Sequence, residues 1–297
     1  MRTASGIAAL GLMLPVFGTG LVAQRPAGQS SGGLPGRVIE VAATEYAFSA
    51  PDTIPAGLTT FLLRQEGRIR TGASLGPAER DSLVVHEGDA TAGFHMLWVV
   101  RLDSGMTAGE FYATAKADSS APRAHLLGGP GFAFPPRTTN ATMVLEPGQY
   151  VLVCYVGSAR ADRRRYHLLR GMFRPLTVVA AGRNRDVLPA ADVTVTLGAD
   201  SISRFSTPIT TAGTWRIGVH NARAKQAEFR MTRVLPGHSV AEALAWRRFD
   251  GKPRVSEPWG GVVAVPPGTS MLTTIELVPG TYLASGVVLV VTERSTR

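Results

Sequence analysis

The stretch that decides the fold is residues 146–154, which read Glu-Pro-Gly-Gln-Tyr-Val-Leu-Val-Cys. The Pro-Gly pair predicts a tight turn, and the Tyr, Val and Leu residues after it predict a strand that leads to Cys154. The beginning of the stretch recurs 132 residues later as Val-Pro-Gly-Thr-Tyr, at residues 278–282. A turn and a strand that return at a fixed distance along the chain indicate an internal repeat.

Further residues recur at the same distance. They are Arg101 and Gly105, which match Arg233 and Gly237, and Thr107 and Glu110, which match Ser239 and Glu242. Thr-x-x-Glu and Ser-x-x-Glu are capping boxes, so they predict two short helices that run to Ala117 and to Trp246. Upstream, residues 51–57 match the spacing of residues 207–213, but here the two segments are 156 residues apart. This distance exceeds the other one, 132, by 24 residues. The difference places a 24-residue insertion in the first copy, between about Glu66 and Phe94.

Short apolar runs bounded by Gly and Pro fill both copies. They are residues 38–43, 59–63, 96–102, 142–145, 149–155 and 176–179 in the first copy, and 193–197, 214–219, 229–234, 272–277 and 281–291 in the second. Runs of this length, rich in Val, Thr and Tyr, are typical of sandwich strands, whereas the Gly-Gly-Pro-Gly of residues 128–131 predicts a loop. We therefore predict an all-β protein of two tandem Greek-key β-sandwiches, each with one short helix.

The N-terminus predicts the compartment. Arg2 precedes an apolar run at residues 7–22, and small residues lead to a possible cleavage site after Ala23, as in a signal peptide. A membrane anchor is the alternative, but a proline and two glycines interrupt the run, which is short for a span. We expect an exported protein, periplasmic or extracellular, whose mature chain has no transmembrane span. The predicted divisions are a signal peptide at 1–23, a linker at 24–37, a first β-domain at 38–180, a linker at 181–191 and a second β-domain at 192–297.

Composition excludes several classes of function. The 297 residues carry a net charge of +9, but 28 of the 31 basic residues are arginines, and they occur all along the chain without a groove-reading motif. Nucleic acid is therefore not an expected partner. The single cysteine excludes an intramolecular disulfide and a cysteine-rich zinc site. The sequence contains no nucleophile elbow, phosphate-binding loop or HExxH motif, so we do not expect an enzyme.

Comparison of the two copies isolates four candidate metal ligands. His95 and Cys154 correspond to Ala227 and Gly286 of the second copy, which also lacks a segment equivalent to the one that carries His167 and Met172. Each of the four alone has a simpler explanation as a core or loop residue. Together they supply two imidazoles, a thiolate and a thioether, which are the donors of a mononuclear blue-copper site.

These residues resemble the cupredoxin family, the blue-copper sandwiches that include plastocyanin. The Pro-Gly-x-Tyr strand before Cys154 is similar to the family's corresponding strand, and His167-x4-Met172, with Gly171 before the Met, is similar to the plastocyanin-type ending. The resemblance covers residues 38–180 well and residues 192–297 only as a fold without ligands. It implies one copper ion bound by His95, Cys154, His167 and Met172. One departure is that twelve residues separate Cys154 from His167, whereas family members place only a few there.

The resemblance implies an exported copper protein that transfers single electrons, with copper storage or delivery as a variant. Four arginines between the cysteine and the second histidine, Arg160, Arg163, Arg164 and Arg165, would present a positive face to an acidic redox partner. The alternative is a metal-free cupredoxin-like module with a binding or structural role in the cell envelope. The second copy favours this alternative, because it keeps the pattern of the fold without the candidate ligands.

Overall fold

The computed structural model describes residues 33–67, 95–117, 124–133, 137–157, 166–181, 186–246 and 254–294. These residues form two β-sheets, two short α-helices and one 3-10 helix, so the predicted all-β fold class is confirmed. The predicted signal peptide, most of the predicted insertion and the arginines at 160–165 lie outside the described residues. We call residues 33–181 the first half of the protein and residues 186–294 the second half.

One sheet has eight strands, and both halves contribute to it. Its spatial order is β11 (Ser203–Phe205), β10 (Val193–Leu197), β12 (Gly213–Asn221), β15 (Ser270–Leu277), β7 (Thr138–Leu145), β4 (Gly57–Gln65), β1 (Arg37–Thr44) and β2 (Ala47–Ser49). The pairs β1–β4 and β10–β12 are parallel, and the other pairs are antiparallel.

The other sheet has nine strands and again runs through both halves. Its spatial order is β17 (Val287–Val291), β16 (Gly280–Ala284), β13 (Ala227–Val234), β14 (Ser256–Val265), β6 (Ala124–Pro130), β5 (Trp98–Leu102), β8 (Gly148–Val153), β9 (Phe173–Val179) and β3 (Thr53–Pro55). Apolar side chains from the strands of both sheets form one buried cluster that extends through both halves. The two halves therefore share a core as well as their sheets.

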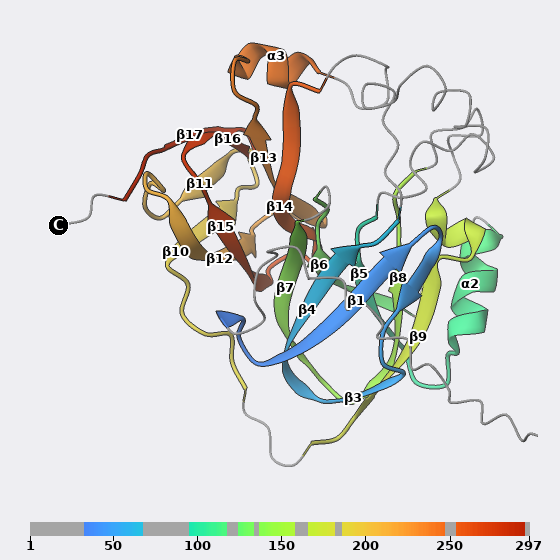
Figure 1. Ribbon diagram of the computed structural model, residues 1–297. Coiled ribbons are helices and arrows are strands. Elements are labelled where there is room, and N and C mark those ends of the chain that lie inside the picture. The colour runs from blue at the N-terminus through green and yellow to red at the C-terminus, as the bar shows by residue number, and fades with distance from the viewer. Residues whose placement is uncertain are drawn as a thin grey trace, which may run out of the picture.

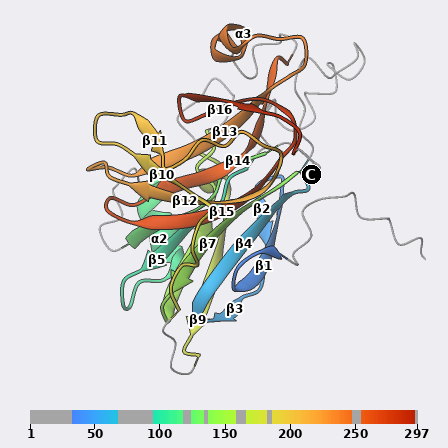
Figure 2. The same cartoon turned by 90° about the vertical axis from the view of Figure 1, so that its left-hand side faces the viewer.

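Main-chain pairing joins the halves near the middle of each sheet. Strand β14 pairs with β6, where Val262 lies opposite Pro130, and β15 pairs with β7. The buried Asn140 side chain strengthens the second junction, because its Nδ2 donates to the Thr274 carbonyl (2.7 Å) and its Oδ1 accepts from the Thr274 amide (2.8 Å). In both views the orange and red strands of the second half adjoin the blue and green strands of the first (Figures 1 and 2).

The two Pro-Gly-x-Tyr turns make the same hydrogen bond. The Tyr150 hydroxyl donates to the Glu146 carbonyl, and the Tyr282 hydroxyl donates to the Val278 carbonyl, each over 2.7 Å. Both tyrosine side chains are almost fully buried, so the hydrogen bond satisfies a hydroxyl that has left water. Each turn is thereby fixed to the strand that follows it.

The loop predicted at residues 128–131 is wrong, since strand β6 continues to Pro130. The glycines permit close main-chain packing there. A Cβ atom on Gly129 would lie 2.0 Å from the Leu97 carbonyl oxygen, and one on Gly261 would lie 2.0 Å from the Phe229 carbonyl oxygen. No other residue fits at either position without moving a neighbouring strand.

Both predicted capping boxes form and begin helices. Thr107 and Glu110 cap α2 (Ala108–Lys116), and Ser239 and Glu242 cap α3 (Val240–Ala245). Helix α2 lies beside β9 on the outside of the first half, where Phe111 joins a second apolar cluster (Figure 1). Neither of these helices has the length and apolar character of a membrane span.

Replacing Asn140 by alanine tests the junction between the halves. Asn140→Ala removes the two hydrogen bonds that the Asn140 side chain makes to the buried main chain of Thr274. We expect the free energy of unfolding to fall by roughly 2–4 kcal/mol, measured by urea denaturation. The control is Gln149→Ala, which removes an exposed carboxamide and should change stability by less than about 0.5 kcal/mol. Equal effects of the two substitutions would contradict the role given to Asn140.

Candidate metal centre

The antiparallel pairing of three strands brings distant residues to one end of the nine-stranded sheet. Trp98 at the start of β5 pairs with Val153 at the end of β8, and Val153 also pairs with Phe173 at the start of β9. His95 precedes β5 by a few residues, and Cys154 directly follows β8. The register of the sheet therefore places these two side chains close together although 59 positions separate them in the sequence.

The long segment between Cys154 and His167 closes at its base. The His167 amide donates to the Val156 carbonyl over 2.9 Å, and Gly157 forms an antiparallel bridge with Tyr166. These contacts return the main chain to Cys154 before His167 begins the 3-10 helix η4 (His167–Arg170). The closed base thus holds His167 near Cys154, although twelve residues separate them in the sequence.

Three donor atoms converge at this end of the first half. The distances are 3.1 Å between His95 Nδ1 and His167 Nδ1, 3.8 Å between Cys154 Sγ and His95 Nδ1, and 3.7 Å between Cys154 Sγ and His167 Nδ1. A triangle with these sides has a point about 2.1 Å from all three corners, and nitrogen and thiolate ligands lie about 2.0–2.3 Å from a zinc ion, a comparable divalent metal. The three side chains thus form a group that could hold one metal ion.

All three side chains are fully buried. Burial raises the pKa of the Cys154 thiol to about 12, because the thiolate loses its hydration, and hydrogen bonds from the main chain at Val156 and Met96 offset only part of this effect. The metal-free protein therefore carries a protonated thiol at neutral pH. Cysteine binds a metal ion as the thiolate, so the binding of a cation by Cys154 requires the release of the thiol proton.

Met172 follows His167 by five residues in the chain. Its side chain is fully buried, its amide donates to the His167 carbonyl (3.0 Å), and its carbonyl accepts from the Cys154 amide (3.3 Å). The main chain of Met172 is thus tied to two of the donor residues. Its role as a fourth ligand stays a prediction from the sequence.

Gln65, the last residue of β4, positions His95 and was missed by the sequence analysis. Its Nε2 donates to the His95 carbonyl (2.5 Å), and its Oε1 accepts from the His95 amide (3.3 Å). The distance of 156 residues found upstream matches Gln65 with Asn221, whose Nδ2 donates to the Val265 carbonyl (2.8 Å). A carboxamide at the corresponding position of both halves is the sequence signal by which Gln65 could have been found.

Tyr46 is a second residue that the sequence analysis missed. It lies in the turn between β1 and β2, and its ring meets the His167 ring edge to face, with 5.0 Å between the centroids. No motif marks Tyr46 in the sequence, because the contact joins segments that lie far apart in the chain.

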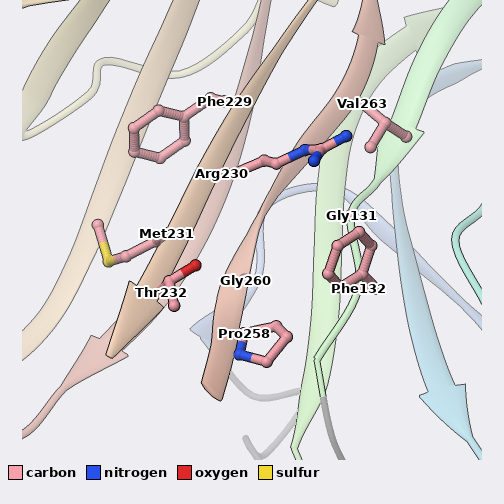
Figure 3. A pocket seen from close by; sticks show the side chains of 9 residues that line it. All are labelled: Gly131, Phe132, Phe229, Arg230, Met231, Thr232, Pro258, Gly260 and Val263. Atoms are coloured by element: carbon pink, nitrogen blue, oxygen red, sulfur yellow. The ribbon is translucent and has the colours of Figure 1, made fainter. Parts of the chain in front are cut away.

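A small pocket between the halves is a different kind of site. It lies between β13, β14 and the end of β6, where the Arg230 guanidinium faces the Phe132 ring at 5.7 Å (Figure 3). Its volume of about 20 Å³ has room for a single water molecule. It is far smaller than the pockets of several hundred Å³ that bind metabolites.

Comparison of the chain with protein-family models and with curated proteins yields no match. Among solved structures, the chain is similar to dithionite-reduced auracyanin from the photosynthetic bacterium Roseiflexus castenholzii, with 18% identity, 48% of this chain and 98% of that chain covered, and a TM-score of 0.29. Auracyanin B is 19% identical, the match covers 49% of this chain and 91% of auracyanin B, and the TM-score is 0.27. For the blue copper oxidase from Nitrosomonas europaea they are 14% identity, 86% of each chain and a TM-score of 0.22.

Substitution of Gln65 tests how His95 is positioned. Gln65→Leu removes both hydrogen bonds to the His95 main chain. Loss of an outer-shell partner of a metal ligand commonly weakens binding 10- to 100-fold, and we expect a loss of about that size for copper, measured by competition with a chelator. Gln149→Leu, at an exposed carboxamide, should leave the affinity unchanged. Unaltered affinity in Gln65→Leu would contradict the positioning role.

The protonated thiol predicts a pH dependence of metal binding. Because the pKa of Cys154 is about 12, each bound cation should displace one proton throughout the neutral range. The apparent affinity should therefore rise about tenfold per pH unit between roughly pH 7.5 and 9, where free histidine is neutral. Competition titrations, combined with a dye that reports released protons, measure both quantities. Affinity that does not change with pH would mean that Cys154 is not a ligand.

Proposed function

We propose that the first half of the protein binds one copper ion through His95, Cys154 and His167, with Met172 as the fourth ligand, and that the protein carries single electrons outside the cytoplasm. The observation that carries this proposal is the triangle of two imidazole nitrogens and one thiol sulfur, whose size suits a single metal ion. Two imidazoles and a thiolate in one plane, with a weak thioether, are the donor set of electron-transfer copper sites.

Bound copper would supply the chemistry, because it alternates between two oxidation states and so accepts and releases one electron. The chain's own residues hold the donors in place. Gln65 fixes the main chain of His95, and the bond from the His167 amide to the Val156 carbonyl fixes His167 relative to Cys154. Donors that are buried and held by the main chain change position little when the charge changes, so the cost of reorganisation during electron transfer stays small.

Storage or delivery of copper is a variant that uses the same donors. The alternative of another class is a metal-free module of the cell envelope. It is favoured by the second half, which contributes to both sheets while Ala227 and Gly286 stand at the positions of His95 and Cys154. Against it stands the convergence of three donor side chains in the first half, since a core that only needs to pack would be filled well by apolar residues.

Copper titration separates these possibilities. Purified protein should bind one equivalent of Cu(II) and turn blue, because the thiolate transfers charge to the metal when it absorbs visible light. Cys154→Ser should abolish the colour, and a redox titration of the wild type should show one reversible one-electron step. The control is Ser203→Ala, which alters a buried residue of the second half and should leave the colour unchanged. Colourless protein that retains no metal would favour the metal-free alternative.

The remaining parts of the proposal concern export and the redox partner. Export is supported by the signal-like N-terminus, and a preference for an acidic partner by Arg160, Arg163, Arg164 and Arg165. These residues predict that oxidation of the reduced protein by ferricyanide, an anion, slows as ionic strength rises.

Replacing the four arginines by serine should flatten this dependence in stopped-flow measurements. The charge-matched control replaces exposed or half-exposed basic residues of the second half, Arg204, Arg216, Lys225 and Arg294. An equal effect of the two sets would show that net charge alone attracts the anion, without a docking face near the proposed metal.

A further inference from the structure

The imidazole of His167 lies beneath the ring of Tyr46. The two rings meet at an interplanar angle of 87°, with their centroids 5.0 Å apart. His167 is fully buried, whereas Tyr46 is only half-buried. The tyrosine ring therefore contributes to the layer that separates this metal donor from solvent.

The main chain at Tyr46 has an unfavourable conformation. Thr44 of β1 pairs with Ala47 of β2, so Glu45 and Tyr46 form a two-residue hairpin turn, in which Tyr46 has a φ angle of +56°. Turns of this kind favour glycine or asparagine at positions with positive φ, and a bulky side chain there is rare. A residue held in such a conformation needs compensating contacts from its surroundings. Because the strained residue lies beside His167, a candidate metal donor, its conformation indicates a role at that donor.

Arg170 holds the tyrosine ring from a second direction. The guanidinium carbon of Arg170 lies 5.4 Å from the centroid of the Tyr46 ring, within the range of a cation–π interaction. Arg170 is the last residue of η4, and His167 is the first. One short helix thus carries both the metal donor and the cation that contacts its cover.

At the corresponding position of the second half, the described residues include no aromatic side chain. At the distance of 156 residues, which also matches β2 with β11, Tyr46 corresponds to Ile202. Ile202 follows Ser201, which has a φ angle of +67°, and is 56% exposed. A turn residue with positive φ therefore occurs in both halves, whereas among the described residues the aromatic ring at this turn belongs to the half with the three donors.

We propose that Tyr46 determines which molecules reach the metal, by closing the centre to small anions and to chelators. This inference rests on the proposed function, because it assigns a role toward the copper ion. The ring covers one side of the His167 imidazole, so an exogenous ligand that approached a bound ion from that side would have to move Tyr46 away from Arg170. A metal centre closed in this way suits a protein that passes electrons to other molecules without binding a substrate at its metal.

The first test measures the cover in the metal-free protein. Diethyl pyrocarbonate modifies accessible histidines, and mass spectrometry identifies each modified residue. His125, whose side chain is 65% exposed, should react in every variant and serves as the internal standard. His167 should stay unmodified in wild type and in Tyr46→Phe, which keeps the ring. In Tyr46→Ala it should become modified, because removal of the ring exposes the imidazole.

The second test uses the copper-loaded protein. Azide should leave the visible spectrum of the wild type unchanged and should produce a saturable change in Tyr46→Ala, which should also lose copper to a chelator at least about tenfold faster. The matched control is Tyr166→Ala. Tyr166 directly precedes His167 and is 47% exposed, but its ring contacts Tyr155, with 5.5 Å between centroids. The substitution keeps the main-chain bridge between Tyr166 and Gly157, so this variant should behave as the wild type.

A further variant guards against misfolding. Tyr46→Gly also removes the ring, and glycine adopts a φ angle of +56° without strain. His167 that stays protected in both Tyr46→Ala and Tyr46→Gly, or copper that resists azide and chelator in both, would overturn the inference and leave the proposed function intact. Wild-type protein that binds no copper would overturn the proposed function, and with it the role of Tyr46 toward the metal.

Discussion

The main-chain hydrogen bond from the His167 amide to the Val156 carbonyl is the contact on which the metal centre depends. Together with the bond from the Leu168 amide to the Cys154 carbonyl, it holds His167 near Cys154, although twelve residues separate the two in the sequence. Closing a loop costs conformational entropy, and the bridge between Gly157 and Tyr166 helps to offset that cost at the base of the segment. With the base closed, the distance between the Cys154 sulfur and the His167 nitrogen is set by the sheet and by a short helix.

Complete burial gives the three donors their chemical character. Away from water, the Cys154 thiol keeps its proton unless a cation replaces it. The sulfur is therefore a neutral thiol in the metal-free protein and would be a thiolate when a metal is bound. The same burial requires cover on every side. Strands of both sheets and the Tyr46 turn provide it, and the second half extends both sheets without adding a donor. The second half therefore lengthens the core that both halves share.

Local signals in the sequence were reliable wherever a few neighbouring residues set the structure. The capping boxes at Thr107 and Ser239 form as predicted, because a cap involves only four consecutive residues. Strand β10 occupies the predicted residues 193–197. Strand β14 was missed, and β6 was assigned in part to a loop, because both contain glycines that disfavour strands in isolation. They form strands because β6 pairs with β5, β14 pairs with β13, and the two pair with each other across the junction of the halves.

The sequence by itself determined which side chains are available for a metal, and comparison of the two predicted copies assigned them to the first without coordinates. It also predicted the strands and turns that carry His95 and Cys154. Only the tertiary structure decided that both imidazoles and the thiol meet, and that Gln65 and Tyr46 contact the histidines. The physical reason is that strand register, loop closure and burial depend on contacts between segments distant in the chain, which leave no periodic trace in the sequence.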